Sequence, residues 1–312
     1  MTQRWIHCPL AALLALCVAI VGLVSTSGVS QAARHALVTK PYYLSLGDSY
    51  SIGYQPGFPG GGGSPGFTKY VATYTGTTLE NFGCGGATTG SLLSSIGCGD
   101  PAATNAVAYP TTTQEQAALA FIAAHPGKVG QVTVEIGGND ITGCVSQPTQ
   151  ALIVACVVAN AATMQTNVTT LVGDLAAALS TAGDTTARIF GLTYPDVILG
   201  DYVFPSGSPN VALANLSVTA FDSIVNPDLL AAYSSVGVGR FVNVTMAPYL
   251  KATTGDDTPL TMTTKLLPYG VIPDSVWEIC KLTYFCTLGN IHANSRGYTF
   301  IGKLVVTQSK LP

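Results

Sequence analysis

Residues 44–54 read LSLGDSYSIGY, and this stretch contains both a strand-like segment and the first candidate for a reactive group. Apolar residues lead into Gly47, Asp48 and Ser49, after which the chain turns polar. Glycine, aspartate and serine are all common in turns, so these three residues alone also fit an ordinary turn. Whether Ser49 is a nucleophile therefore depends on what the rest of the chain places beside it.

Strand-like and helical segments alternate along the chain on the C-terminal side of this stretch. The expected strands are residues 42–46, 78–82, 131–136, 187–192 and 240–244. The expected helices are residues 117–124, 157–179, 211–236 and 295–307. This alternation predicts an open α/β fold, with a parallel sheet covered by helices on both faces. Ligands of such sheets bind beyond the carboxyl ends of the strands, and Ser49 follows one of these ends.

The N-terminus has the features of a secretory signal peptide. Arg4 precedes an uncharged apolar run over residues 9–24, and the Ser-Gln-Ala ending at Ala32 fits the small-x-small rule for cleavage. We expect residues 1–32 to be removed after Ala32, which leaves residues 33–312 as a single exported domain. The mature protein is expected to be soluble, without a membrane span.

Composition limits the possible partners. Charged residues make up 9% of the chain, hydrophobic residues 47%, and the formal net charge is −3. Nucleic-acid binding requires clustered lysine and arginine, so this composition argues against it. The balance fits a large core under a neutral surface.

Six cysteines remain once the two in the signal peptide are removed. They form three pairs that are close in sequence: Cys84 with Cys98, Cys144 with Cys156, and Cys280 with Cys286. An even number in an exported chain predicts disulfides, and proximity favours these pairs among the 15 possible connectivities. Zinc sites need short Cys-x-x-Cys or His-rich spacings that are not present, so no metal is expected.

A nucleophilic serine needs a base that removes its proton and a third group that holds the base. Histidine is the commonest base, and the chain contains four. His7 lies in the signal peptide, His35 near the new N-terminus, and His125 at the expected end of a helix. Elimination leaves His292, without showing that it meets Ser49.

Two residues are candidates for donating hydrogen bonds to a developing oxyanion. Asn139 follows the third expected strand in the sequence GGND, although Asn139 and Asp140 could equally cap a helix or turn. Gly86 follows the second expected strand and could offer its backbone N–H, although it could equally be a turn glycine.

Two other motifs are chance matches in a glycine-rich segment. Residues 56–67, PGFPGGGGSPGF, contain both G-x-G-x-x-G and a G-x-S-x-G around Ser64. No strand precedes them, and Pro65 is unsuited to the turn of a nucleophile elbow. We expect a loop here and a second, long irregular segment over residues 248–288.

Together these blocks resemble those of the SGNH (GDSL) hydrolases, in particular secreted actinobacterial-type GDSL esterases and lipases. The shared blocks are GDS near the mature N-terminus, a glycine after the second strand, GGND after the third, and H-x-N-x-x-G-Y from His292. They cover essentially the whole mature chain. The resemblance implies a flavodoxin-like three-layer α/β/α sandwich with a central five-stranded parallel sheet and no cofactor. Members of this type also tend to carry three local disulfides.

The resemblance also implies roles for individual residues. Ser49 becomes the nucleophile and His292 the general base. The oxyanion hole is assigned to the Ser49 and Gly86 amides together with the Asn139 side chain.

One block departs from the family pattern, because Gly289 stands where an aspartate usually orients the histidine. The nearest acids upstream are Asp274 and Glu278, and neither has the usual spacing. Some similar secreted members use a main-chain carbonyl instead, so we expect the Gly289 carbonyl to accept the Nδ1 proton of His292. The Asn290 side-chain oxygen is the lesser alternative. Either arrangement predicts a Ser–His dyad rather than a triad.

The implied function is that of a monomeric, secreted serine carboxylester hydrolase, an esterase or lipase acting on a small-molecule or lipid ester. An acetylated polysaccharide is the alternative substrate on the same fold. A catalytically silent surface-binding protein is the third hypothesis.

Overall fold

The computed structural model describes residues 40–57, 66–99, 106–203, 210–245, 263–266 and 270–310. The expected signal peptide, its cleavage site and most of the glycine-rich segment lie outside these residues.

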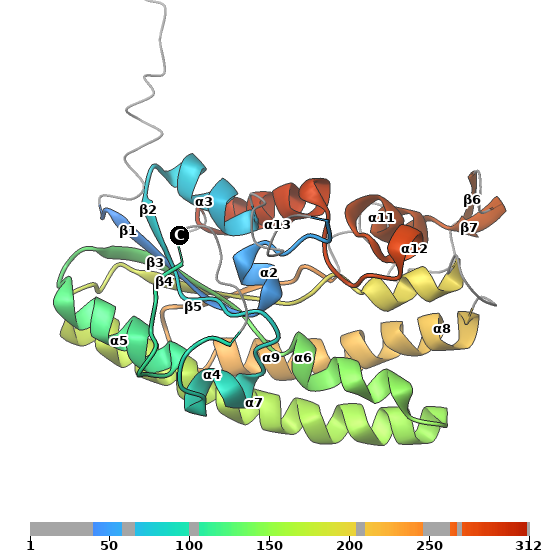
Figure 1. The fold of residues 1–312 in the computed structure, drawn as a ribbon, viewed down its shortest axis with the longest axis horizontal. Helices are drawn as coiled ribbons and strands as arrows, with labels where there is room; N and C mark the ends of the chain where they lie inside the picture. Colours follow the sequence, from blue (N-terminus) through green and yellow to red (C-terminus); the bar gives the residue numbers. More distant parts are fainter. Residues whose placement is uncertain are drawn as a thin grey trace, which may run out of the picture.

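Five parallel strands form the central sheet, in the order β2-β1-β3-β4-β5 (Figure 1). The strands are β1 (Tyr42–Gly47), β2 (Thr78–Asn81), β3 (Val129–Glu135), β4 (Arg188–Leu192) and β5 (Gly239–Val242). Each lies within two residues of a predicted strand. The chain moves from β1 to β2 on one side and then to β3 on the other, so the strand order reverses at β1. Ligand sites of open α/β sheets form at such a reversal.

Helices cover both faces of the sheet and complete the three-layer α/β/α sandwich (Figure 1). One face carries α3 (Phe67–Thr75) and α13 (Ser295–Gln308). The other face carries α5 (Gln114–Ala124), α7 (Gln150–Thr181) and α9 (Asn226–Tyr233). The flavodoxin-like fold class expected from the sequence is therefore confirmed.

The long helix α7 has the predicted amphipathic pattern. Its buried residues recur at intervals of three and four from Val157 to Leu179, and they face the sheet and α9. By length and composition alone, α7 could also cross a membrane. In this fold its buried stripe instead belongs to the main hydrophobic core.

Several short helical segments lie in the connections between the five strands of the sheet. They are α2 (Ser49–Ile52), α4 (Thr89–Ser94), α6 (Gly138–Ile141), the 3₁₀ helices η1 (Thr142–Ser146) and η2 (Val197–Tyr202), α8 (Val211–Ala220) and the π-helix η3 (Phe221–Val225).

Residues 270–288 are more regular than expected, so the prediction of an irregular segment is wrong there. Strands β6 (Thr263–Leu266) and β7 (Gly270–Pro273) form an antiparallel pair, and α11 (Asp274–Leu282) and α12 (Phe285–Leu288) follow. α11 buries Val276 and Ile279 against Leu199 in a small second core. Since α11 has only nine residues, too few apolar positions repeat to reveal its period.

Disulfides join the three predicted pairs, which are Cys84–Cys98, Cys144–Cys156 and Cys280–Cys286. The second bond ties η1 to the first turns of α7. The third ties α11 to α12.

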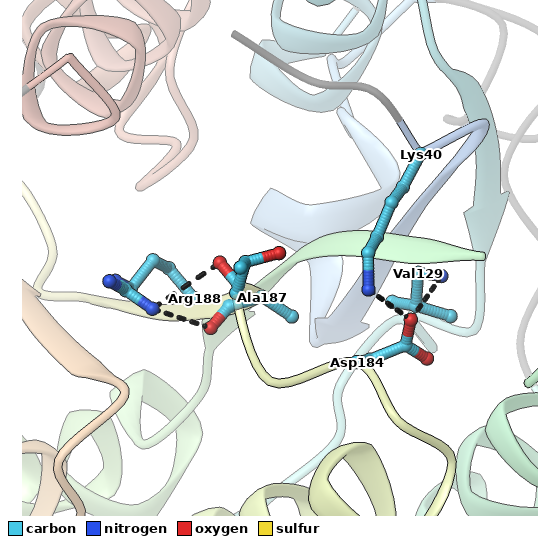
Figure 2. A network of polar contacts seen from close by, with 6 residues as sticks. Lys40, Val129, Asp184, Ala187 and Arg188 are labelled. Carbon is cyan, nitrogen blue, oxygen red and sulfur yellow. Dashed lines mark hydrogen bonds and ion pairs between the residues drawn. The ribbon is translucent and has the colours of Figure 1, made fainter. Parts of the chain in front are cut away.

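Lys40 fastens the start of β1 to the segment that follows α7 (Figure 2). Its Nζ lies 2.6 Å from Oδ1 of Asp184, and the same oxygen accepts the N–H of Val129 at 3.2 Å. The Asp184 side chain is fully buried, so loss of the lysine would leave a buried charge without its ion pair. This contact therefore holds together the starts of β1 and β3.

Candidate active site

Ser49 is the first residue after the turn that ends β1. Gly47 has φ 140°, and a side chain there would collide with the backbone of Glu135 in β3. Only glycine permits this close approach. Asp48 then caps α2 by accepting the N–H of Tyr50 at 2.9 Å, which leaves the Ser49 side chain half-buried at the sheet edge.

His292 reaches Ser49 from the opposite end of the chain. Its Nε2 lies 2.8 Å from the Ser49 Oγ. The His292 carbonyl accepts the N–H of Tyr284 at 2.9 Å, which fixes the loop between α12 and α13. The ring centroid of Tyr54 lies 4.4 Å from that of the imidazole. The structure therefore brings together the serine and the histidine that the sequence singled out.

Asn290, not Gly289, contacts the other nitrogen of the imidazole. Its Oδ1 lies 2.8 Å from His292 Nδ1 and also accepts the His292 backbone N–H at 3.1 Å. The expectation of a Gly289 carbonyl is therefore wrong, and the lesser alternative holds. Gly289 ends α12 in the left-handed conformation, with φ 64°. The Asn290 side chain closes a local turn onto residue 292, which brings its oxygen to the ring.

The tautomer of His292 follows from this contact. An amide oxygen can only accept, so Nδ1 carries the proton and Nε2 is left free to accept the Ser49 hydroxyl hydrogen. Burial lowers the pKa of His292 to about 4. The imidazole is therefore neutral, and able to act as a base, throughout the neutral and mildly acidic range.

Neither upstream acid is a hydrogen-bond partner of His292. Glu278 pairs with Lys281 on the same helix, and Asp274 lies in the first turn of α11. The described part of the chain thus orients this histidine by a neutral amide alone.

Asn139 lies in α6, just beyond β3, beside the loop that contains Gly86. Its Nδ2 donates to the Ala87 carbonyl at 2.9 Å and to Asp48 Oδ2 at 3.3 Å. Asn139 does not cap α6, whose first position follows Gly137 without a side-chain cap. These contacts place an amide donor next to the residue that precedes Ser49.

Two backbone N–H groups complete this edge of the sheet. Gly86 has φ 73°, and space is open where a side chain would stand. Within the described residues, the N–H groups of Gly86 and Ser49 have no acceptor. Unpaired N–H groups at the carboxyl end of a sheet are suited to an anionic oxygen.

Asp48 and Tyr194 support this edge, and the sequence did not single out either of them. The Tyr194 hydroxyl donates to Asp48 Oδ2 at 2.6 Å, and the Tyr194 ring packs over Gly138. Burial raises the pKa of Asp48 to about 7, against the lowering effect of the Tyr194 and Tyr50 hydrogen bonds. The position of Tyr194 just after β4 is the signal that would have identified it.

Asp140 serves the structure rather than the oxyanion edge. Its carboxylate accepts the backbone N–H of Thr89 at 2.9 Å and the Thr89 hydroxyl at 2.6 Å. It thereby holds the first turn of α4. Among the residues that the structure describes, no three His, Cys, Asp or Glu side chains gather as metal ligands do.

Comparison with known proteins places residues 45–226 in the family described as GDSL-like Lipase/Acylhydrolase. The match ends before His292. Among curated protein sequences, none matches this chain significantly.

Several solved structures are similar to this chain at low sequence identity. An extracellular lipase from Streptomyces rimosus is 18% identical, with a TM-score of 0.48 over 87% of this chain and 100% of that chain. A phospholipase A1 from Streptomyces albidoflavus is 19% identical, with a TM-score of 0.43 over the same shares. An acetylxylan esterase from Geobacillus stearothermophilus is 13% identical, with a TM-score of 0.39 over 87% and 95%.

Proposed function

Because this chain belongs to the GDSL-like lipase/acylhydrolase family, whose members hydrolyse esters, we propose that it is a secreted serine carboxylesterase or lipase. The observation that carries the proposal is the 2.8 Å contact between Ser49 Oγ and His292 Nε2 at the carboxyl edge of the sheet. A serine next to a neutral imidazole is an activated nucleophile.

In the first half of the reaction, His292 Nε2 takes the Ser49 proton while Oγ attacks the carbonyl carbon of the ester. The carbonyl oxygen becomes an oxyanion that accepts hydrogen bonds from the Ser49 and Gly86 N–H groups and from Asn139. Asn139 Nδ2 has two hydrogens, of which one donates to the Ala87 carbonyl and the other makes a longer contact with Asp48. We assign the second hydrogen to the oxyanion. His292 then gives its proton to the departing alcohol, which leaves an acyl group on Ser49.

In the second half, His292 removes a proton from a water molecule, which attacks the acyl carbon. A second oxyanion forms in the same place. Its collapse breaks the bond to Oγ, and His292 returns the proton to Ser49. The products are the carboxylic acid and the free enzyme.

Asn290 makes this a dyad supported by an amide. Its oxygen fixes the tautomer of His292, as a carboxylate would, but contributes no full negative charge to the imidazolium that forms. The imidazolium is therefore stabilised less than in a Ser-His-Asp triad.

Export and a single domain over residues 33–312 belong to the same proposal. The N-terminal apolar segment before Ala32 supports export, and so do the three disulfides, since such bonds persist in oxidising compartments. N-terminal sequencing of the protein recovered from the culture medium tests this part. We expect a mature chain that begins at Ala33.

Hydrolysis of p-nitrophenyl butyrate by single and double variants tests the catalytic assignment. Ser49→Ala and His292→Ala should each abolish hydrolysis, and the double variant should be little worse, because the two residues act as a unit. Ser64→Ala is the matched control and should retain full activity. A fluorophosphonate probe should label Ser49 alone. More than a few per cent of activity in either single variant would reject the assignment.

A further inference from the structure

An apolar pocket opens beside Ser49, between α7 and α8, which run side by side (Figure 1). Its cavity volume is about 90 Å³, and the empty space with the open mouth included is about 830 Å³. Ser49 and Asn139 lie at its edge. One wall carries Val145, Ile153 and Val157, and the other carries Leu213, Leu216 and Phe221.

The polar side chains that line this pocket already have partners within the protein. Thr142 donates its hydroxyl to the Gly138 carbonyl. Ser217 donates to Asp196 Oδ2 at 2.8 Å. Asp48 accepts hydrogen bonds from Tyr50 and Tyr194. A sugar ring would leave its hydroxyls unpaired against such walls, whereas a hydrocarbon chain needs no partner.

A π-helix forms part of the wall. α8 continues without a break into η3, and both end residues of η3, Phe221 and Val225, line the pocket. π-turns within α-helices are rare and occur frequently at functional sites. Here the wider turn sets two apolar side chains against the space next to Ser49.

We propose that this pocket binds the acyl chain of the ester, and that the enzyme prefers straight acyl chains of octanoate length or longer to acetate. The inference rests on the proposed esterase function and specifies its substrate class. The acyl group stays bonded to Ser49 through both steps, whereas the alcohol must leave and be replaced by water. The apolar pocket therefore suits the acyl part of the substrate.

A p-nitrophenyl ester series with acyl groups from acetate to dodecanoate tests the preference. Each buried methylene contributes up to about fourfold to kcat/KM, so the additional methylenes of octanoate should raise kcat/KM over acetate by up to roughly 4 × 10³-fold if all are buried. A wild type that hydrolyses acetate and octanoate equally well, or favours acetate, would overturn the inference and leave the esterase function intact.

Ala220→Trp tests the location, because Ala220 lines the pocket and an indole there would fill it. The octanoate preference should be lost, and the melting temperature of the variant reports whether it is folded. The matched control is Ala212→Trp, on the exposed side of the same helix, which should keep the wild-type profile. If Ala220→Trp does not fold, Ala220→Leu should shift the optimum to shorter chains. An unchanged profile in the pocket variants would overturn the inference.

Two further measurements separate the remaining outcomes. A series of acetate esters with alcohols of increasing length should show little dependence on length, and a steep dependence would assign the pocket to the alcohol. Binding of decanoate to Ser49→Ala, measured by calorimetry, should show a negative heat-capacity change that Ala220→Trp removes. If the wild type hydrolyses no ester but Ser49→Ala binds decanoate in this way, the esterase function fails while the apolar chain site stands. Hydrolysis confined to acetyl-xylan, without decanoate binding, would overturn the acyl-chain site.

Discussion

Asn290 determines how His292 titrates. A carboxylate next to an imidazole raises its pKa, but here the neutral amide oxygen lies 2.8 Å from Nδ1 and burial lowers the pKa to about 4. The acid limb of kcat/KM reports the pKa of the base in the free enzyme. The wild type should therefore remain active at pH 5, where an ordinary histidine would be largely protonated.

Changing Asn290 to aspartate should shift the acid limb of the kcat/KM profile to higher pH. Asn290→Asp keeps the acceptor in place and adds a charge, so the pKa of His292 should rise by about 1–3 units. A pH profile of kcat/KM between pH 3.5 and 9 measures the shift. Asn290→Ala should instead lower kcat without such a shift.

Asp274→Asn and Glu278→Gln are the controls for this prediction. Both should retain most of the wild-type kcat, because neither acid is a hydrogen-bond partner of the imidazole. A loss near 10⁴-fold at either residue is typical of a triad acid made neutral and would contradict the role of Asn290.

Tyr194 acts on the oxyanion edge through Asp48. Tyr194→Phe removes the hydroxyl that donates to Asp48 but keeps the ring that packs over Gly138. We expect kcat to fall about tenfold with little change in KM, which corresponds to the loss of one hydrogen bond. Asn139→Ala removes the donor itself and should cost roughly 10²–10³ in kcat.

The matched control is Tyr233→Phe, whose hydroxyl contacts the Val134 carbonyl at 3.3 Å. It should change thermal stability and leave kcat unchanged. An equal effect of both tyrosine variants on stability alone would show that Tyr194 only supports the fold.

At the scale of single elements, the sequence predicted the segments with strong periodicity or long apolar runs. The five strands of the sheet and α7 are of this kind. It did not predict α11, which is too short to show a period. It ranked the Asn290 contact second to the Gly289 carbonyl, because the choice between them depends on the backbone conformation of one loop. Ser49, His292 and Asn139 were accessible from the sequence because each follows a recognisable element or block. Tyr194 also follows a predicted strand, but its hydrogen bond to Asp48 joins two different strand ends, and that contact is not recorded in any local pattern.

The Cys280–Cys286 disulfide joins α11 to α12, directly before the loop that carries His292. Replacing both cysteines by serine should loosen this loop. It should lower kcat more than the loss of another disulfide does. The matched control is the Cys144→Ser, Cys156→Ser pair, which opens the bond between η1 and α7. Activity and melting temperature should be measured for both double variants. A larger loss of kcat in the control pair would contradict the prediction.

Over the whole molecule, the buried acid Glu135 contributes to the dependence of stability on pH. Glu135 is fully buried in β3, and neither carboxylate oxygen has a partner among the described residues. Burial, together with the nearby Asp48, raises its pKa well above the usual value. The folded protein therefore keeps a proton that the unfolded chain releases above about pH 4.5. The free energy of unfolding decreases as the pH rises from that value towards the raised pKa of Glu135 in the folded protein.

Glu135→Gln should flatten this dependence. Because His292 and Asp48 are present in both proteins, the difference between the pH dependences of the wild type and the variant isolates the contribution of Glu135. Above about pH 4.5 the wild type should lose up to about 1.4 kcal/mol more unfolding free energy per pH unit than the variant, and its melting temperature should fall relative to that of the variant. The variant should show a smaller slope, whereas Glu278→Gln should retain the wild-type slope. Equal slopes in all three proteins would contradict the role of Glu135.

Ser49 and His292 are 243 residues apart in sequence, and the loop that carries His292 is held by contacts with α11, with α12 and with the Tyr50 hydroxyl. A ribosome makes the serine 243 residues before the histidine. A nascent chain or a truncated chain that ends between these two residues has a nucleophile without its base, and under the proposed mechanism it is chemically silent. Hydrolysis begins only after the segment that carries His292 has been made and has folded onto the segment that carries Ser49. Enzymatic activity thus reports that two segments made at different times have come together.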